Sequence, residues 1–131
     1  MSEPPPETTA AGRQLGRVPT AAVAAALSAY WLAMFVGTHL PPSPQPDDRG
    51  LDKPIHLLAF FGLSLLLSAT LRKLGRPIGV AVPILLAYGA ADELSQIPVG
   101  RTCELMDWIC DAIGTLAGWG FARLLLGHKS T

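Results

Sequence analysis

Four apolar runs, each about 20 residues long, constrain this chain more than any other feature. A helix of about 20 residues crosses a hydrocarbon core about 30 Å thick, because each residue adds about 1.5 Å. Half of the residues are hydrophobic and only 15% are charged, which is too apolar for an ordinary soluble domain of 131 residues. The runs therefore predict an all-α bundle of four transmembrane helices, at about residues 18–40, 52–71, 78–97 and 105–126.

The chain before the first run has a different composition. Residues 1–17 are rich in Pro, Thr, Ala and Glu, and we expect a disordered N-terminal tail there. Arginines precede the first run, as they also do in a cleaved signal peptide. The apolar part of a signal peptide is shorter, however, and no A-x-A-like cleavage site follows, so an uncleaved span is favoured. The expected organisation is a tail, 1–17, and one four-helix transmembrane domain, 18–126.

Basic residues are unevenly divided between the two sides of a membrane that four spans create. The N-terminus, the 72–77 turn and the C-terminus share one side, which holds seven of the ten lysines and arginines: Arg13, Arg17, Arg72, Lys73, Arg76, Arg123 and Lys129. The positive-inside rule places that side in the cytoplasm. We therefore expect a multi-pass protein of the cell membrane with both termini cytoplasmic and most acidic residues at or near the outer face.

Three of the runs each carry two polar residues spaced four apart. These pairs are Asp52 and His56, Asp92 and Gln96, and Asp107 and Asp111. Side chains with this spacing are neighbours on one helix face, and His56, Asp92 and Asp111 lie roughly 6–10 Å below the outer boundary. Ionisable residues inside a membrane are costly and indicate a functional site. We predict a ligand-binding site made by Asp52, Lys53, His56, Asp92, Glu93, Gln96, Arg101, Asp107 and Asp111.

Asp92 and Glu93 are the most unusual members of this set. They lie near the C-terminal end of their helix, where the macrodipole disfavours negative charge. They therefore need cationic or hydrogen-bonding partners, and the candidates are Lys53, His56 and Arg101.

The other acids allow a simpler interpretation, and the charges of the whole site do not balance. Asp52 and Asp107 begin their helices, so capping alone explains them equally well. The five carboxylates contribute −5 and the two basic side chains +2, which leaves −3 before the histidine is counted. Carboxyl protonation, a cationic ligand group or a divalent metal ion would each offset this excess. For a metal, the candidate ligands are Asp92, Glu93 and Asp111, and the three alternatives stay open.

The ordered polar blocks resemble those of the VanZ-like family of small integral membrane proteins. The matching blocks, within residues 50–126, are Asp52-Lys53-x-x-His56-x-x-x-Phe60, then Asp92-Glu93-x-x-Gln96, then Pro98-x-Gly100-Arg101, and then Asp107-x-x-x-Asp111-x-x-Gly114-x-x-x-Gly118. One position departs from the family pattern, since Asp111 stands where the family usually has Asn. The family's namesake is linked to low-level teicoplanin resistance at the cell envelope, so the resemblance implies an envelope-facing membrane protein without assigning a reaction.

Three functions fit these residues. We favour a non-enzymatic protein whose outer-face pocket binds an envelope component, such as a lipid-linked cell-wall precursor or a lipid head group. The alternative is a membrane-embedded enzyme acting on such a lipid, with His56 or Glu93 as general acid and base, although the sequence has no recognisable nucleophile motif. Proton or ion translocation along the carboxylates is the third.

The same patterns indicate the partners. Membrane lipids are expected, whereas nucleic acid is not, because the basic residues are dispersed and lack aromatic neighbours. The small residues of Gly114-x-x-x-Gly118 form a face suited to close helix contact. That contact is expected either within the bundle or between two copies of the chain.

Overall fold

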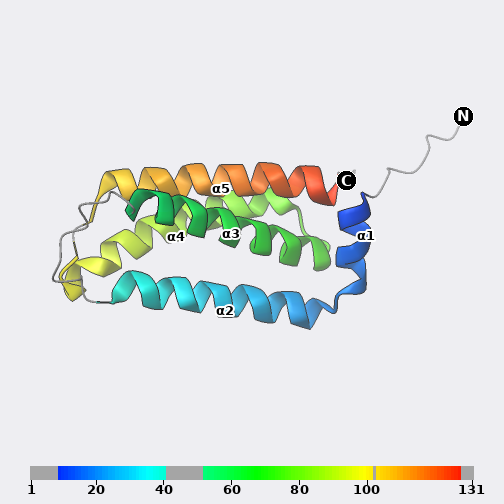
Figure 1. The fold of residues 1–131 in the computed structure, drawn as a ribbon, viewed down its shortest axis with the longest axis horizontal. Helices are drawn as coiled ribbons and strands as arrows, with labels where there is room; N and C mark the ends of the chain where they lie inside the picture. The colour runs from blue at the N-terminus through cyan, green and yellow to red at the C-terminus, as the bar shows by residue number, and fades with distance from the viewer. Residues whose placement is uncertain (1–8, 41–51, 102, 128–131) are drawn as a thin grey trace, which may run out of the picture.

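The computed structural model describes residues 9–40, 52–101 and 103–127, and within them every regular element is helical. The α-helices are α1 (Ala10–Arg17), α2 (Thr20–His39), α3 (Asp52–Lys73), α4 (Ala81–Gln96) and α5 (Leu105–Leu126), and two 3₁₀ turns, Ile78–Val80 and Ile97–Val99, extend α4. Helices α2 to α5 run side by side as a bundle (Figure 1). In the described part of the chain, α2, α3, α5 and the segment Ile78–Val99, which is α4 with its two 3₁₀ turns, are long and apolar enough to cross a membrane. The prediction of an all-α bundle is therefore confirmed, and its four helices that could span a membrane have boundaries within two residues of those expected.

The bundle has two chemically different ends. The end called here the polar end is formed by His39, Asp52, Val99 and Leu105, and the end called the basic end is formed by Thr20, Lys73, Ile78 and Leu126. Helix α1 lies across the basic end, beside the end of α5 (Figure 1).

The prediction of disorder throughout 1–17 is wrong for residues 10–17, which form α1, and residues 1–8 lie outside the described part of the chain. The Thr9 side chain caps α1 by accepting a hydrogen bond from the Gly12 amide at 3.1 Å. At the other end of α1, the Lys73 ammonium donates to the carbonyls of Leu15, Gly16 and Val18, at 3.1, 3.3 and 2.6 Å. These contacts fix α1 and the turn that follows it to the basic end of α3.

Helices α3 and α5 form the tightest contact in the bundle, and two glycines make it possible. A Cβ atom at Gly114 would overlap the Leu57 carbonyl oxygen, and one at Gly118 would lie 2.5 Å from the Phe61 carbonyl oxygen. Ser64 of α3 also donates a hydrogen bond to the Thr115 carbonyl of α5, at 2.8 Å. The Gly114-x-x-x-Gly118 face thus packs within the bundle, against α3, and is already covered in a single chain.

Helix α2 is attached much more loosely than the others. Val23 is its one buried residue, whereas α3 and α5 each bury seven. Large apolar side chains such as Leu32 and Val36 point outward and are 64% and 48% exposed. An apolar outer surface of this kind is stable against lipid but not against water. The fold thus consists of an α3–α4–α5 core with α2 along one side.

Candidate functional site

Five ionisable side chains from three helices meet near the polar end. They form two overlapping groups that share His56, namely Asp52, His56 and Asp107, and His56, Glu93 and Asp111; within each group the donor atoms lie within 4.8 Å of one another. We call these five residues the central cluster. The His56 Nδ1 and Asp111 Oδ1 atoms are 2.9 Å apart. Of the three residues that the sequence placed at one depth, His56 and Asp111 meet here, whereas α4 contributes Glu93 to the cluster instead of Asp92.

The cluster is buried and incompletely hydrogen-bonded. Glu93 is 3% exposed and Asp111 2%. Glu93 Oε2 accepts a hydrogen bond from the Glu104 amide at 3.0 Å. Glu93 Oε1 and Asp111 Oδ2, by contrast, have no hydrogen-bond partner among the described residues. Burying a carboxylate oxygen without a hydrogen-bond partner costs free energy. The described residues do not offset this cost for Glu93 Oε1 and Asp111 Oδ2.

Lys53 lies at the rim of the central cluster. Its Nζ atom is 3.3 Å from Glu104 Oε2 and 3.5 Å from Asp107 Oδ1. The Lys53 and Glu104 side chains are 45% and 48% exposed, so their attraction is weakened by solvent. Asp52, Glu93, Asp107 and Asp111 carry a formal charge of −4, which Lys53 reduces to −3 before His56 is counted.

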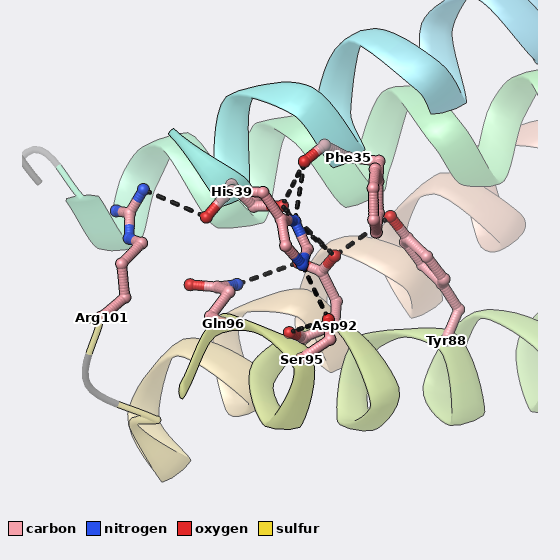
Figure 2. A network of polar contacts seen from close by, with 8 residues as sticks. Phe35, His39, Tyr88, Asp92, Ser95, Gln96 and Arg101 are labelled. Atoms are coloured by element: carbon pink, nitrogen blue, oxygen red, sulfur yellow. Dashed lines mark hydrogen bonds and ion pairs between the residues drawn. The ribbon is translucent and has the colours of Figure 1, made fainter. Parts of the chain in front are cut away.

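Asp92 belongs to a second group of polar residues, which joins α4 to α2 (Figure 2). Its Oδ1 atom lies 3.2 Å from Thr38 Oγ1 and 3.3 Å from the Tyr88 hydroxyl, and its Oδ2 atom accepts from Gln96 Nε2 at 3.0 Å. His39 Nδ1 is 4.0 Å from the same carboxylate. These contacts supply the partners that Asp92 needs near a helix C-terminus.

His39 strengthens the same connection. Its Nε2 atom lies 2.9 Å from Ser95 Oγ of α4, and its ring stacks on Phe35 with the ring centroids 4.0 Å apart. Thr38, His39, Tyr88, Asp92, Ser95 and Gln96 together are called here the α2–α4 cluster (Figure 2). Helix α2 is therefore bound to the core at the polar end mainly through polar contacts.

Arg101 follows a turn that requires glycine. Gly100 has a φ of +80°, a left-handed conformation that side chains disfavour, and the Arg101 amide then bonds back to the Gln96 carbonyl at 3.3 Å. The guanidinium reaches α2 and donates to the Thr38 carbonyl at 3.3 Å (Figure 2). Among the described residues, Arg101 thus contacts neither Asp92 nor Glu93.

The expected partners of the two adjacent acids are thus corrected. Lys53 pairs with Glu104 and Asp107 instead of Asp92 or Glu93. His56 joins Glu93 in one metal-compatible group, whereas Asp92 belongs to neither such group. The set Asp92, Glu93 and Asp111, proposed from the sequence as metal ligands, is therefore divided between two clusters, because neighbouring residues on a helix point about 100° apart.

A cavity of about 390 Å³ lies between α2 and α3. It is lined by Tyr30, Ala33, Met34, Gly37, Thr38, Asp52, Ile55, His56, Ala59, Phe60 and Arg101. Its polar lining residues come from the polar end, and its remaining walls are apolar apart from the Tyr30 hydroxyl. That hydroxyl donates to the Ala59 carbonyl at 3.0 Å. The cavity thus extends from a polar mouth into an apolar interior, with His56 shared between its wall and the central cluster.

Sequence reasoning missed Thr38, His39 and Tyr88 as site residues. A signal was present, because Thr38 and His39 lie at the polar end of the first run, at the depth of the Asp92 end of α4. Tyr88 precedes Asp92 by four residues, so the two share a helix face.

Comparison with known proteins identifies one family. The family model described as VanZ/LLP1 matches residues 8–126. No curated protein and no solved structure matches the chain. The match begins ahead of α1, so this helix lies within the matched region.

Proposed function

We propose that this chain, which belongs to the VanZ/LLP1 family, is a membrane protein that binds an anionic lipid of the cell envelope in the cavity between α2 and α3. The phosphate-bearing head group would lie at the polar mouth beside Arg101, and the acyl or prenyl chain would lie along the apolar walls. A lipid-linked cell-wall precursor has this chemistry. Through such binding the protein would influence teicoplanin susceptibility, as the family resemblance implies.

The observation that carries this proposal is the polarity of the cavity. From Thr38 to Tyr30 the lining follows α2 for eight residues, or about 12 Å at the helical rise. Ile55, on the opposite wall, is 60% exposed, so this wall of the cavity is partly accessible from outside the bundle. A lipid chain would thus enter from the bilayer without leaving an apolar environment.

Arg101 is suited to the head group. A guanidinium carries five N–H donors in a rigid fork that matches phosphate geometry. The bond to the Thr38 carbonyl engages only part of that fork. The acids of the central cluster lie beyond His56, so an amine or sugar hydroxyl attached to the phosphate would find acceptors there.

Filling the cavity from Gly37 should weaken lipid binding without unfolding the protein. A Cβ atom at Gly37 meets nothing within 4 Å, and the same is true of Gly120 on α5, which does not line the cavity. Replacing either glycine by leucine favours the helical conformation by about 0.8 kcal/mol. We expect Gly37→Leu to weaken binding of a fluorescent polyprenyl phosphate in detergent micelles at least about tenfold, and Gly120→Leu to leave it unchanged.

The same titration identifies the lipid and tests the proposal. Fluorescent phosphatidylglycerol, measured alongside the polyprenyl phosphate, distinguishes a bulk phospholipid from a cell-wall carrier. Arg101→Ala should weaken whichever lipid binds, and Arg101→Lys should restore only part of the affinity because lysine lacks the bidentate fork. Equal affinity in wild type, Gly37→Leu and Arg101→Ala would rule out this site.

We place the polar end on the outer side of the membrane, with both termini in the cytoplasm. The charge distribution between the loops supports this orientation. Cys103 provides a natural test, because it is exposed at the polar end whereas Cys110 lies within α5. A membrane-impermeant maleimide should label wild-type protein in intact cells and should not label Cys103→Ser. If Cys103 is labelled only after the cells are lysed, the polar end lies in the cytoplasm and the proposed orientation is wrong.

A second function is favoured by the 2.9 Å contact between His56 and Asp111. A carboxylate that holds an imidazole in this way is the arrangement used to orient a general base, and His56 also lines the cavity. The two functions are distinguished by analysing the bound lipid after incubation. A cleaved or transferred product that is lost in Glu93→Gln would favour the enzyme, whereas recovery of intact lipid favours the binding protein.

A further inference from the structure

We propose that His56, Glu93 and Asp111 form a binding site for one divalent transition-metal ion. The three residues come from α3, α4 and α5, and all three are buried. This site differs from the lipid cavity and does not depend on it, although His56 belongs to both.

The distances suit a shared ion. Donor atoms of the three residues lie within 4.8 Å of one another. Two ligands on opposite sides of an ion with bonds of about 2.2 Å are about 4.4 Å apart, so small side-chain shifts bring all three atoms into range. The 2.9 Å separation of His56 Nδ1 and Asp111 Oδ1 matches adjacent ligands on one ion.

The unpartnered oxygens point to a ligand more strongly than the acidity of the site does. Glu93 Oε1 and Asp111 Oδ2 are buried, and no hydrogen-bond donor among the described residues reaches them. A proton on His56 would account for its contact with Asp111 Oδ1, but it would leave these two oxygens without partners. A metal ion bound by the imidazole, by Glu93 Oε1 and by both oxygens of Asp111 would satisfy all of these atoms together.

The charge supports the same occupant. The central cluster with Lys53 has a formal charge of −3 before His56 is counted. A divalent ion reduces this to −1, without the cost of holding several uncompensated carboxylates in a low-dielectric region. His56 also lines the cavity between α2 and α3, which provides an entry path for the ion.

The ligand types select the class of metal. Carboxylate oxygens alone would suit Mg²⁺ or Ca²⁺, but an imidazole nitrogen favours Zn²⁺, Fe²⁺ or Mn²⁺. We therefore expect Zn²⁺ and Mn²⁺ to bind more tightly than Mg²⁺ and Ca²⁺. Neutral imidazole and ionised carboxylates are the binding forms, so affinity should fall as the pH is lowered.

The test is the metal content of the full-length protein, purified in detergent without chelator and dialysed against Zn²⁺ or Mn²⁺. Elemental analysis should find about one ion per chain in wild type. Glu93→Gln and Asp111→Asn should each lower the affinity about 100-fold or more, because each removes a ligand. Asp92→Asn is the matched control, since it neutralises a neighbouring buried acid of the α2–α4 cluster and should retain the ion.

Three outcomes would overturn the site: wild type that binds no stoichiometric ion, full retention in both ligand variants, or equal loss in Asp92→Asn with the fold preserved. Circular dichroism and gel filtration report the fold of each variant. Thermal unfolding of wild type gives a readout that needs no variant. Zn²⁺ or Mn²⁺ should raise the Tm and Mg²⁺ should not, because an ion that binds only the native state stabilises it; no rise with any ion would count against the proposal.

Discussion

Gly114→Ala should destabilise the bundle by about 2 kcal/mol or more, although it adds a single methyl group. That methyl would overlap the Leu57 carbonyl oxygen and would lie 3.1 Å from the Phe61 amide nitrogen, both of which are backbone atoms of α3. Backbone cannot rotate away as a flexible side chain can, so α3 and α5 must separate. The separation would weaken the contact along its length, including the bond between Ser64 and Thr115.

Gly120→Ala is the matched control, because it places the same methyl on the same helix where nothing lies within 4 Å. There the substitution should be neutral or stabilise by up to about 1 kcal/mol through helix propensity. Reversible unfolding in mixed micelles with increasing dodecyl sulfate, followed by circular dichroism, measures both variants. Equal stability of the two would mean that the α3–α5 approach is looser than the glycines indicate.

Asp92→Ala should release α2 from the core at the polar end and cost about 3 kcal/mol. Removing the carboxylate breaks its hydrogen bond to the Thr38 hydroxyl of α2 and leaves the Tyr88 hydroxyl and the Gln96 amide of α4 without their acceptor. Hydrogen bonds to a charged group are worth about 1.5–3 kcal/mol each. The same unfolding titration measures the loss.

Leu94→Ala provides the comparison, since it truncates a side chain of similar size that is 63% exposed on the outer surface of α4. We expect it to change stability by less than about 0.5 kcal/mol. Asp92→Asn should fall between the two, because the amide keeps the shape and one acceptor oxygen. An Asp92→Ala variant as stable as Leu94→Ala would show that α2 is held by apolar packing instead.

The spans were predictable from the sequence because lipid imposes a simple rule on length and polarity. Hydropathy along the sequence predicts the four helices without any information on which helices pack together. Helix α1 escaped this rule. It has only eight residues, and its stability comes from the Thr9 cap and from Lys73, which is more than fifty residues away in the chain. A composition typical of disorder does not reveal tertiary contacts of that kind.

The site was predictable as a layer but not as an arrangement. Depth along each helix placed His56, Asp92 and Asp111 at one level, but in the structure Glu93 takes the place of Asp92 beside His56 and Asp111. Asp92 and Glu93 lie at nearly the same depth but point in different directions around the helix axis. Depth alone does not predict that direction. The cationic partners were wrong for a related reason, since Lys53 and Arg101 lie at helix ends, where loop geometry decides which neighbour a long side chain reaches.

The loose attachment of α2 has a mechanical consequence. Lys73 holds the turn before α2 at one end, and Asp92 holds Thr38 at the other. Val23 is its one buried residue, so bending of α2 away from α3 disturbs little fully buried packing, although it would break the bond between Tyr30 and the Ala59 carbonyl. The same displacement between α3 and α5 would pull apart closely packed backbones. The bundle therefore combines a stiff three-helix frame with one compliant wall, and the compliant wall is the one that borders the cavity.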